Sequence, residues 1–337
     1  MRTAAQTTIS TCALADFHRD KTAFAQKLGR AFQELGFVCL TDHGVPDETI
    51  EDNFRACKAF FALPEEIKMK YHDPDRVRAR GYTPATEYRA RDSKQFWHLG
   101  RELPEGHTRY GDIMPRNFDV GEIVDFNRRG MALFDALDRA GRVVLSALAL
   151  FLGQDEEHFA DRVDLGNSVL RTVYYPPIDD LDALPLRAAP HEDVNLITLL
   201  VGSGEPGLEA LTRDGEWVPI DTAPGTIVCN IGEMMQRYSN NVLRSTTHRV
   251  VSPRGEARLR PRYCSPYFLH PNPDMTLAPL ATCVTAERPN AYPNPISAHD
   301  YMQARHPDGR YDRLPGGVND GAKAGPSPQG LSDQART

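Results

Sequence analysis

The sequence lacks a long apolar run, and this absence argues against a membrane protein. Its longest apolar candidate is Val143–Leu152, well short of the roughly 18 residues that a helix needs to span a bilayer. The segment Met1–Ser10 also lacks the charged and then apolar order of a secretory signal. We therefore expect a cytoplasmic protein with no membrane partner.

Closely paired cysteines are missing too. The six cysteines include no Cys-x-x-Cys pair, which argues against a zinc ribbon or a thioredoxin-like motif. Isolated cysteines in a reducing compartment are usually buried free thiols. We expect most of these cysteines to be structural.

An excess of basic residues is the third absence. The 337 residues carry a formal net charge of −7, whereas a protein that binds nucleic acid through its phosphates needs a basic surface. We expect no nucleic-acid partner. The hydrophobic share of 40% and the charged share of 25% are ordinary for a globular chain with a sizeable core. The sequence leaves the oligomeric state open.

The first half of the chain has a mainly helical pattern. Apolar residues recur at helical spacing over 24–35, where Asp20 is placed to cap the start of a helix and Gly36 to end it. A second helix is predicted from Asp47, and a long one along the apolar face of Phe134–Leu152.

Short β-rich runs dominate the second half, with turn signals such as Asp214-Gly215 between them. The predicted strands are Phe37–Leu40 and then Ser168–Tyr175, Asn195–Val201, Leu208–Leu211, Trp217–Ile220, Thr226–Cys229, Arg249–Val251 and Tyr263–Leu269. Many short, closely spaced strands favour a sandwich or a jelly roll.

We therefore predict a mixed α/β (α+β) fold in one composite domain. Residues 1–165 would form a mainly helical region packed on a β-rich core at 166–310. Residues 315–337 are rich in Gly, Pro, Ser and Gln and poor in apolar side chains, so they are predicted to form a disordered tail.

A His-x-Asp pair followed by a distant His is typical of non-haem iron sites. Two imidazoles and one carboxylate can hold Fe(II) on one face and leave the other open. The pair occurs three times, at 18–20, 191–193 and 306–308. In the first, the Asp has a role as a helix cap, and the third runs through Pro into a turn. The second directly precedes a strand-like run, and His248 lies 55 residues further on.

Several ordered segments resemble the isopenicillin N synthase-like branch of the Fe(II)/2-oxoglutarate-dependent dioxygenases. They are Gly36–Gly44, Lys94–Gly100, Arg171–Pro177, Pro190–Leu200, Pro224-Gly225, Asn230–Ser239, Ser245–Pro253 and Arg262–Phe268. The resemblance covers about residues 8 to 305. It implies a double-stranded β-helix (jelly roll) buttressed by N-terminal helices, and it implies that His191, Asp193 and His248 are the iron ligands.

The resemblance also implies a site for the cosubstrate. Arg262 takes the place of the family arginine that binds the far carboxylate of 2-oxoglutarate, and Tyr175 resembles a tyrosine that contacts the cosubstrate. Where the family has a serine two residues after the arginine, this chain has Cys264, a weaker hydrogen-bond donor. Ser265 should point to the opposite face of the strand.

The implied activity is oxidation of a small molecule, by hydroxylation or desaturation, with Fe(II) and O2 and with release of succinate and CO2 from 2-oxoglutarate. Two alternatives stay open: an oxidase of the same fold that needs no 2-oxoglutarate, and a metal-free jelly-roll binding protein. The candidate substrate contacts are Arg89, Lys94, Phe96, Trp97, His98 and Tyr238, whereas Asn230 and Gln236 are expected to support the barrel.

Overall fold

The structure is a computed structural model. It describes residues 9–73, 80–85, 94–107, 110, 113–178, 186–202, 205–220 and 225–305. Arg89, Pro224, the third His-x-Asp pair and the predicted tail at 315–337 lie outside these ranges. Within them, no helix combines the length and the apolar composition that a bilayer crossing requires.

Helices alternate with strands in the first half of the chain and recur near its end. The α-helices are α1 (Lys21–Leu35), α2 (Asp47–Phe61), α3 (Glu65–Lys68), α4 (Phe126–Phe151), α5 (Glu233–Tyr238) and α6 (Ala298–Ala304). Single turns of 3-10 helix lie at Leu14–His18, Met69–Tyr71, Ala160–Arg162, Gly255–Leu259 and Ala281–Cys283.

The strands form two sheets. The larger has eight strands in the order β1-β2-β10-β7-β12-β5-β4-β3, and the smaller has four in the order β6-β11-β8-β9. The strands are β1 (Thr11–Ala13), β2 (Phe37–Thr41), β3 (Gly81–Thr83), β4 (Gln95–Gly100), β5 (Val169–Tyr175), β6 (Leu186–His191), β7 (Ile197–Gly202), β8 (Leu208–Leu211), β9 (Trp217–Pro219), β10 (Ile227–Ile231), β11 (His248–Val251) and β12 (Arg262–Leu269).

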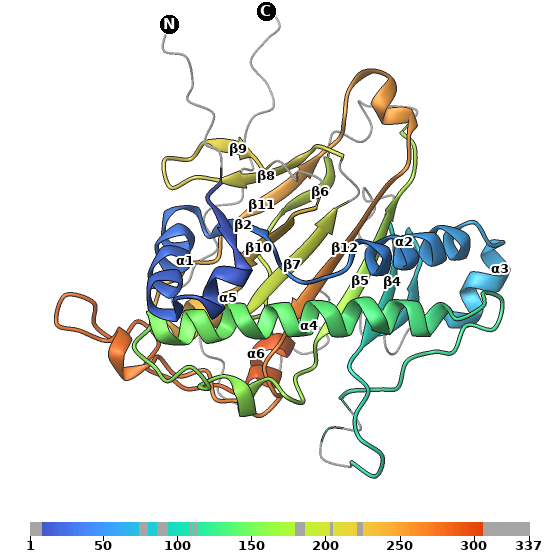
Figure 1. Cartoon of the computed structure of the whole chain (residues 1–337). Coiled ribbons are helices and arrows are strands. Elements are labelled where there is room, and N and C mark those ends of the chain that lie inside the picture. The colour runs from blue at the N-terminus through green and yellow to red at the C-terminus, as the bar shows by residue number, and fades with distance from the viewer. Residues whose placement is uncertain are drawn as a thin grey trace, which may run out of the picture.

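The long helix α4 crosses one face of the larger sheet, with α1 and α2 packed against it (Figure 1). Because side chains alternate along a strand, Tyr267 on β12 points toward the helix, where its ring lies 5.0 Å from that of Phe134. Its hydroxyl donates to Asp138 Oδ1 at 2.6 Å. The other face of the sheet is turned toward the smaller sheet, where Phe37 and Val228 pack with Ala188, Leu208 and Val250.

The sequence placed several boundaries correctly. Asp20 caps α1 by accepting a hydrogen bond from Ala23 N at 2.9 Å, and Gly36 ends the helix in the left-handed region at φ +78°. Gly215, at φ +83°, lies in the β8–β9 hairpin. The mixed α+β class, the long helix and each predicted strand are confirmed to within a few residues.

The strands β1, β4 and β6 were not predicted, whereas β3 lies in the polar segment Gly81–Lys94, where the sequence predicts loop and an edge strand. The β6 segment is Ala-rich and contains Pro190, so it has neither the alternation nor the β-branched residues of a typical strand. The first half of the chain also supplies β1 and β2 at one edge of the larger sheet and β3 and β4 at the other. Segments 1–165 and 166–310 therefore share one sheet.

Replacing Gly36 with Ala should lower the free energy of unfolding by about 2 kcal/mol or more. The backbone lies at φ +78°, and an added Cβ would approach Thr246 Oγ1 to 2.3 Å and the Arg244 carbonyl oxygen to 2.8 Å. Gly44→Ala is the matched control, because Gly44 has φ +71° but nothing within 4 Å of the added Cβ. Denaturant unfolding of both variants measures the difference, and equal losses would contradict the predicted clash.

Candidate metal centre

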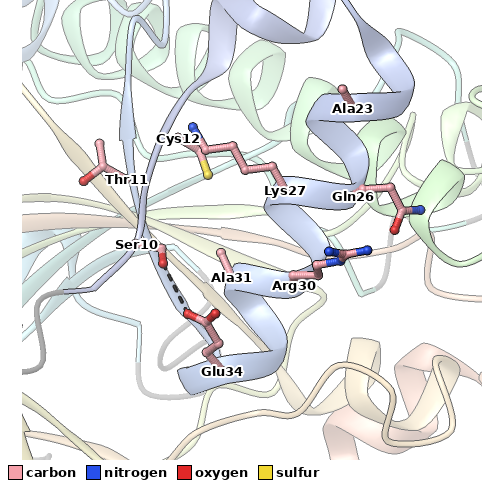
Figure 2. Close-up of a pocket in the computed structure, with 9 residues that line it drawn as sticks. All are labelled: Ser10, Thr11, Cys12, Ala23, Gln26, Lys27, Arg30, Ala31 and Glu34. Atoms are coloured by element: carbon pink, nitrogen blue, oxygen red, sulfur yellow. Dashed lines mark hydrogen bonds between the residues drawn. The ribbon is translucent and has the colours of Figure 1, made fainter.

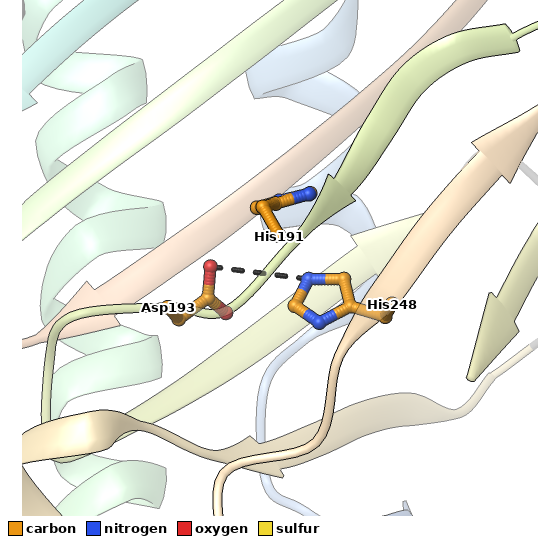
Figure 3. Close-up of side chains that lie close together, drawn as sticks. All are labelled: His191, Asp193 and His248. Atoms are coloured by element: carbon orange, nitrogen blue, oxygen red, sulfur yellow. Dashed lines mark ion pairs between the residues drawn. The ribbon is translucent and has the colours of Figure 1, made fainter. Parts of the chain in front are cut away.

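The predicted triad comes together where the two sheets meet at one end. His191 is the last residue of β6 and His248 the first of β11, and their Cα atoms are partners in register. Asp193 follows in the loop between β6 and β7. One possible ligand atom from each of the three side chains lies within 4.8 Å of the others, and the two imidazole centroids are 4.3 Å apart (Figure 3). Among the described residues this is the one such cluster of His, Cys and carboxylate side chains.

Hydrogen bonds to backbone carbonyls orient both imidazole rings. His191 Nδ1 donates to the Ala189 carbonyl at 2.8 Å, and His248 Nδ1 donates to the Thr246 carbonyl at 3.0 Å. A carbonyl can only accept, so each Nδ1 carries the proton and each Nε2 keeps its lone pair. This is the arrangement that orients histidine ligands in metal sites. The His248 ring also packs edge-on against Phe37, at 5.5 Å.

The larger sheet holds the carboxylate. Asp193 Oδ2 accepts hydrogen bonds from Thr198 Oγ1 at 2.6 Å and from Asn230 Nδ2 at 2.8 Å. Thr198 and Asn230 are cross-strand partners on β7 and β10. The other oxygen, Oδ1, faces His248 Nε2 at 3.9 Å (Figure 3). The sequence assigned Asn230 to barrel support and gave Thr198 no role.

The surroundings favour the protonation states that bind a metal. Removal from water, and the charge that a protonated His248 would add, lower the pKa of His191 to about 4. Burial alone would raise the pKa of Asp193, but His248, His191 and the two hydrogen-bond donors lower it overall. Neutral imidazoles and an ionised carboxylate are the forms that coordinate metals. Asp193 and His248 are 8% and 7% exposed, and His191 is more accessible.

The donor set therefore fits Fe(II). Two imidazole nitrogens and one carboxylate oxygen with open positions are characteristic of non-haem iron oxygenases. The smaller sheet supplies the imidazoles, and the larger sheet fixes the carboxylate.

A second polar group lies on the inner face of the larger sheet. Arg262 and Tyr175 are Cα partners on β12 and β5, and the guanidinium carbon lies 5.3 Å from the phenol ring centroid. Arg262 Nη1 donates to Cys264 Sγ at 3.6 Å. Ser265 faces the other way, within 2.9 Å of Thr172 Oγ1. The prediction that Cys264, and not Ser265, shares a face with Arg262 is confirmed.

The candidate substrate contacts divide between core and inner face. Trp97 and Tyr238 belong to the main hydrophobic core. Phe96 lies with Val173, Tyr175 and Cys264 in a smaller cluster.

The sequence did not single out Arg171, which occupies the same inner face. Its guanidinium carbon lies 5.0 Å from the ring of Phe96 and 4.9 Å from that of Phe268. Its Nε donates to His98 Nε2 at 2.7 Å. Cross-strand pairing of His98 with Arg171 brings these two side chains together, and their separation in the sequence gives no signal of it.

A surface hollow of about 510 Å³ lies apart from these groups, between β1 and α1 (Figure 2). Its lining residues are Ser10, Thr11, Cys12, Ala23, Gln26, Lys27, Arg30, Ala31 and Glu34. Burial raises the pKa of the Cys12 thiol, so it is not an activated nucleophile. The hollow is lined by no member of the triad.

Family models match both halves of the chain. Residues 9–119 match the N-terminal region of the family described as non-haem dioxygenase in morphine synthesis, and residues 166–271 match the 2OG-Fe(II) oxygenase superfamily, where 2OG is 2-oxoglutarate. A proline hydroxylase of Petromyces alliaceus is 30% identical over 300 residues, which cover 84% of this chain and 92% of that relative. A 2-oxoglutarate-Fe(II) type oxidoreductase of Emericella nidulans is 29% identical, with coverages of 85% and 84%.

Solved structures with the same architecture support this family membership. A protein of Caulobacter crescentus assigned to the 2OG-Fe(II) oxygenase family is 44% identical, has a TM-score of 0.82, and is matched over 88% of this chain and 97% of its own. Neurospora crassa T7H, solved with alpha-KG and thymine, is 26% identical, with a TM-score of 0.80 and coverages of 90% and 98%. This shared architecture confirms the predicted jelly-roll core. Because relatives at these identities extend over most of the chain, the protein belongs to the Fe(II)- and 2-oxoglutarate-dependent oxygenases, in the isopenicillin N synthase-like branch, and is an oxidoreductase that uses Fe(II), 2-oxoglutarate and O2.

Proposed function

We propose that His191, Asp193 and His248 are the iron ligands of this dioxygenase, and that it oxidises a small molecule bound between the two sheets. The convergence of the three ligand atoms within 4.8 Å carries the proposal. Bound Fe(II) would supply the coordination site at which O2 and 2-oxoglutarate react, with succinate and CO2 as the products of the cosubstrate.

The protein's own part is to hold the ligands still and to keep them in their metal-binding protonation states. The Ala189 and Thr246 carbonyls fix the two imidazole tautomers. Thr198 and Asn230 occupy one carboxylate oxygen of Asp193 and so present the other to the metal. Hydrogen-bonded supports of this kind raise metal affinity, typically by 10- to 100-fold.

Arg262 is the proposed partner of the far carboxylate of 2-oxoglutarate, with Tyr175 and Cys264 beside it. Arg262 is 4% exposed, and its Nε is a buried donor without a hydrogen-bond partner. A planar guanidinium such as this one matches a carboxylate with two parallel hydrogen bonds.

The substrate is proposed to lie against the aromatic and basic side chains of the inner face. Phe96 and Phe268 offer flat apolar surfaces on either side of Arg171, which can donate to a carbonyl or carboxylate. This fits a compact ring compound with a hydrogen-bond acceptor. The names of two relatives, a proline hydroxylase and a T7H solved with thymine, are in keeping with that class.

An anaerobic titration tests the proposal directly. Wild-type enzyme with Fe(II) should develop the visible charge-transfer band of an iron chelate as 2-oxoglutarate is added, and should release succinate slowly under air. Absence of both signals would show that the side chains between the two sheets do not form the proposed iron site.

Thr198→Val should weaken Fe(II) binding by roughly 10- to 100-fold with little change in fold. The variant keeps the shape of the side chain but removes one of the two donors to Asp193 Oδ2. Thr172→Val is the matched control, because Thr172 pairs with Ser265 on the opposite face of the sheet. Equilibrium Fe(II) titration measures both, and equal affinities would show that the Thr198 contact does not support the metal.

A further inference from the structure

A second buried arginine lies beside Arg262 and comes from the opposite sheet. Arg187, on β6, is 4% exposed, as is Arg262. Its guanidinium carbon lies 5.8 Å from the Tyr175 ring centroid, and Arg262 approaches the same ring to 5.3 Å. Arg187 Nη2 donates to the Arg260 carbonyl at 3.2 Å, two residues before Arg262. Both side chains thus converge on Tyr175 from facing sheets.

A β-bulge directs Arg187 inward. Val250 on β11 is paired with Ala188, whereas the next residue, Val251, is paired with Leu186, so Arg187 has no residue opposite it. An extra residue of this kind does not follow the regular alternation of side chains between the two faces of the strand. Bulges near functional sites commonly change the direction of a side chain in this way. Ala188 packs in the apolar cluster between the sheets, and the bulge lets its neighbour Arg187 reach inward too.

The two guanidiniums lack a carboxylate partner. Within the described part of the chain, neither forms an ion pair, and the Nε of each is a buried donor without a hydrogen-bond partner. Glu205 acts on both only through its more distant charge. Burial and the charge of Arg262 lower the pKa of Arg187. Burial acts on Arg262 in the same direction, but its contacts with Cys264 and Tyr175 and the charge of Glu205 leave its pKa raised.

Two cations buried together are unfavourable unless an anion joins them, because each has lost its water and each repels the other. Unpaired donors at this depth therefore point to an anionic ligand. In the proposed function, the anionic group that Arg262 binds is the far carboxylate of 2-oxoglutarate.

We propose that Arg187 is a second binding residue for the cosubstrate, and that it and Arg262 clamp the far carboxylate of 2-oxoglutarate from opposite sheets. The inference rests on the proposed function of Arg262 and extends it. Cys264 offers Arg262 only a weak sulfur contact at 3.6 Å, and a thiol is a poor donor to a carboxylate. Arg187 would supply the second strong donor that a serine hydroxyl supplies in the family pattern.

The test compares two ligands on the iron-loaded enzyme under anaerobic conditions. 2-Oxoglutarate and pyruvate present the same keto acid to a metal, but pyruvate lacks the far carboxylate. Arg187→Met should weaken 2-oxoglutarate binding by about 30-fold or more, as expected when one partner of a desolvated charge pair is lost. Pyruvate affinity should not change. Calorimetry and the chelate band measure both without turnover.

Two control variants distinguish direct binding of the far carboxylate by Arg187 from a general effect of mutation on the site. Arg260→Met removes an exposed arginine two residues from Arg262 and should leave both affinities unchanged. Arg187→Lys keeps the buried charge but loses the planar fork, so its 2-oxoglutarate affinity should lie between those of wild type and Arg187→Met. If Arg187→Met fails to fold, the lysine variant carries the same comparison.

Three results would overturn the inference. The first is that Arg187→Met binds 2-oxoglutarate as tightly as wild type, whereas Arg262→Met binds it weakly. This result would leave the proposed function intact. The second is an equal loss for 2-oxoglutarate and pyruvate, which would make Arg187 a structural residue. The third is no 2-oxoglutarate binding by wild-type enzyme, which would overturn the proposed function as well.

Discussion

Three single variants, His191→Ala, Asp193→Ala and His248→Ala, should each abolish turnover and leave a folded protein. Each variant removes one of the three side chains that converge within 4.8 Å, and a three-ligand iron site has no spare protein ligand. The measurements are Fe(II) binding, succinate release and the circular dichroism spectrum. Near wild-type activity in any one of the three would show that its assignment as a ligand is wrong.

Among these variants, Asp193→Ala should be the least stable. It leaves Thr198 and Asn230 buried without their common acceptor, at a cost of about 1–3 kcal/mol for each unsatisfied donor. Asp193→Asn keeps an acceptor in place and separates loss of metal from loss of stability. His18→Ala is a matched control from the other described His-x-Asp pair, because His18 is an exposed residue next to the start of α1. It should leave activity unchanged.

Arg262→Ala should raise the apparent KM for 2-oxoglutarate by about 30-fold or more. The reason is that Arg262 is 4% exposed, so a carboxylate bound to it would be largely removed from water and would lose its cationic partner. Fe(II) binding should survive, since Arg262 is not among the three proposed ligands. Succinate release across a range of 2-oxoglutarate concentrations measures the effect, and an unchanged KM would remove Arg262 from the cosubstrate site.

Cys264→Ser provides the mild counterpart to Arg262→Ala. A hydroxyl is a better donor than a thiol, so 2-oxoglutarate binding should tighten, by less than roughly tenfold because a neutral hydrogen bond contributes only about 0.5–1.5 kcal/mol. Turnover that proceeds equally well in wild-type enzyme without 2-oxoglutarate would show instead that Arg262 binds a carboxylate of the substrate.

The sequence by itself determined the local features. The helix cap at Asp20 and the stop at Gly36 depend on hydrogen bonds and backbone angles of neighbouring residues. The two-residue period of a strand was enough to place Cys264 on the face of Arg262 and Ser265 on the other. His191, Asp193 and His248 were chosen because segments typical of the family occur around them in the expected order. The other two His-x-Asp pairs were set aside because one lies at a helix cap and the other in a turn.

Only the tertiary structure decided which distant residues meet. Thr198 and Asn230 reach Asp193 because β7 and β10 are neighbours in the larger sheet, and Arg171 reaches His98 because β5 lies beside β4. Arg187 lies on a strand that was not predicted, at a bulge that exists only relative to β11. Pairing between strands far apart in the chain is set by the packing of the whole core, and no local pattern in β6 encodes that its arginine turns inward beside Arg262.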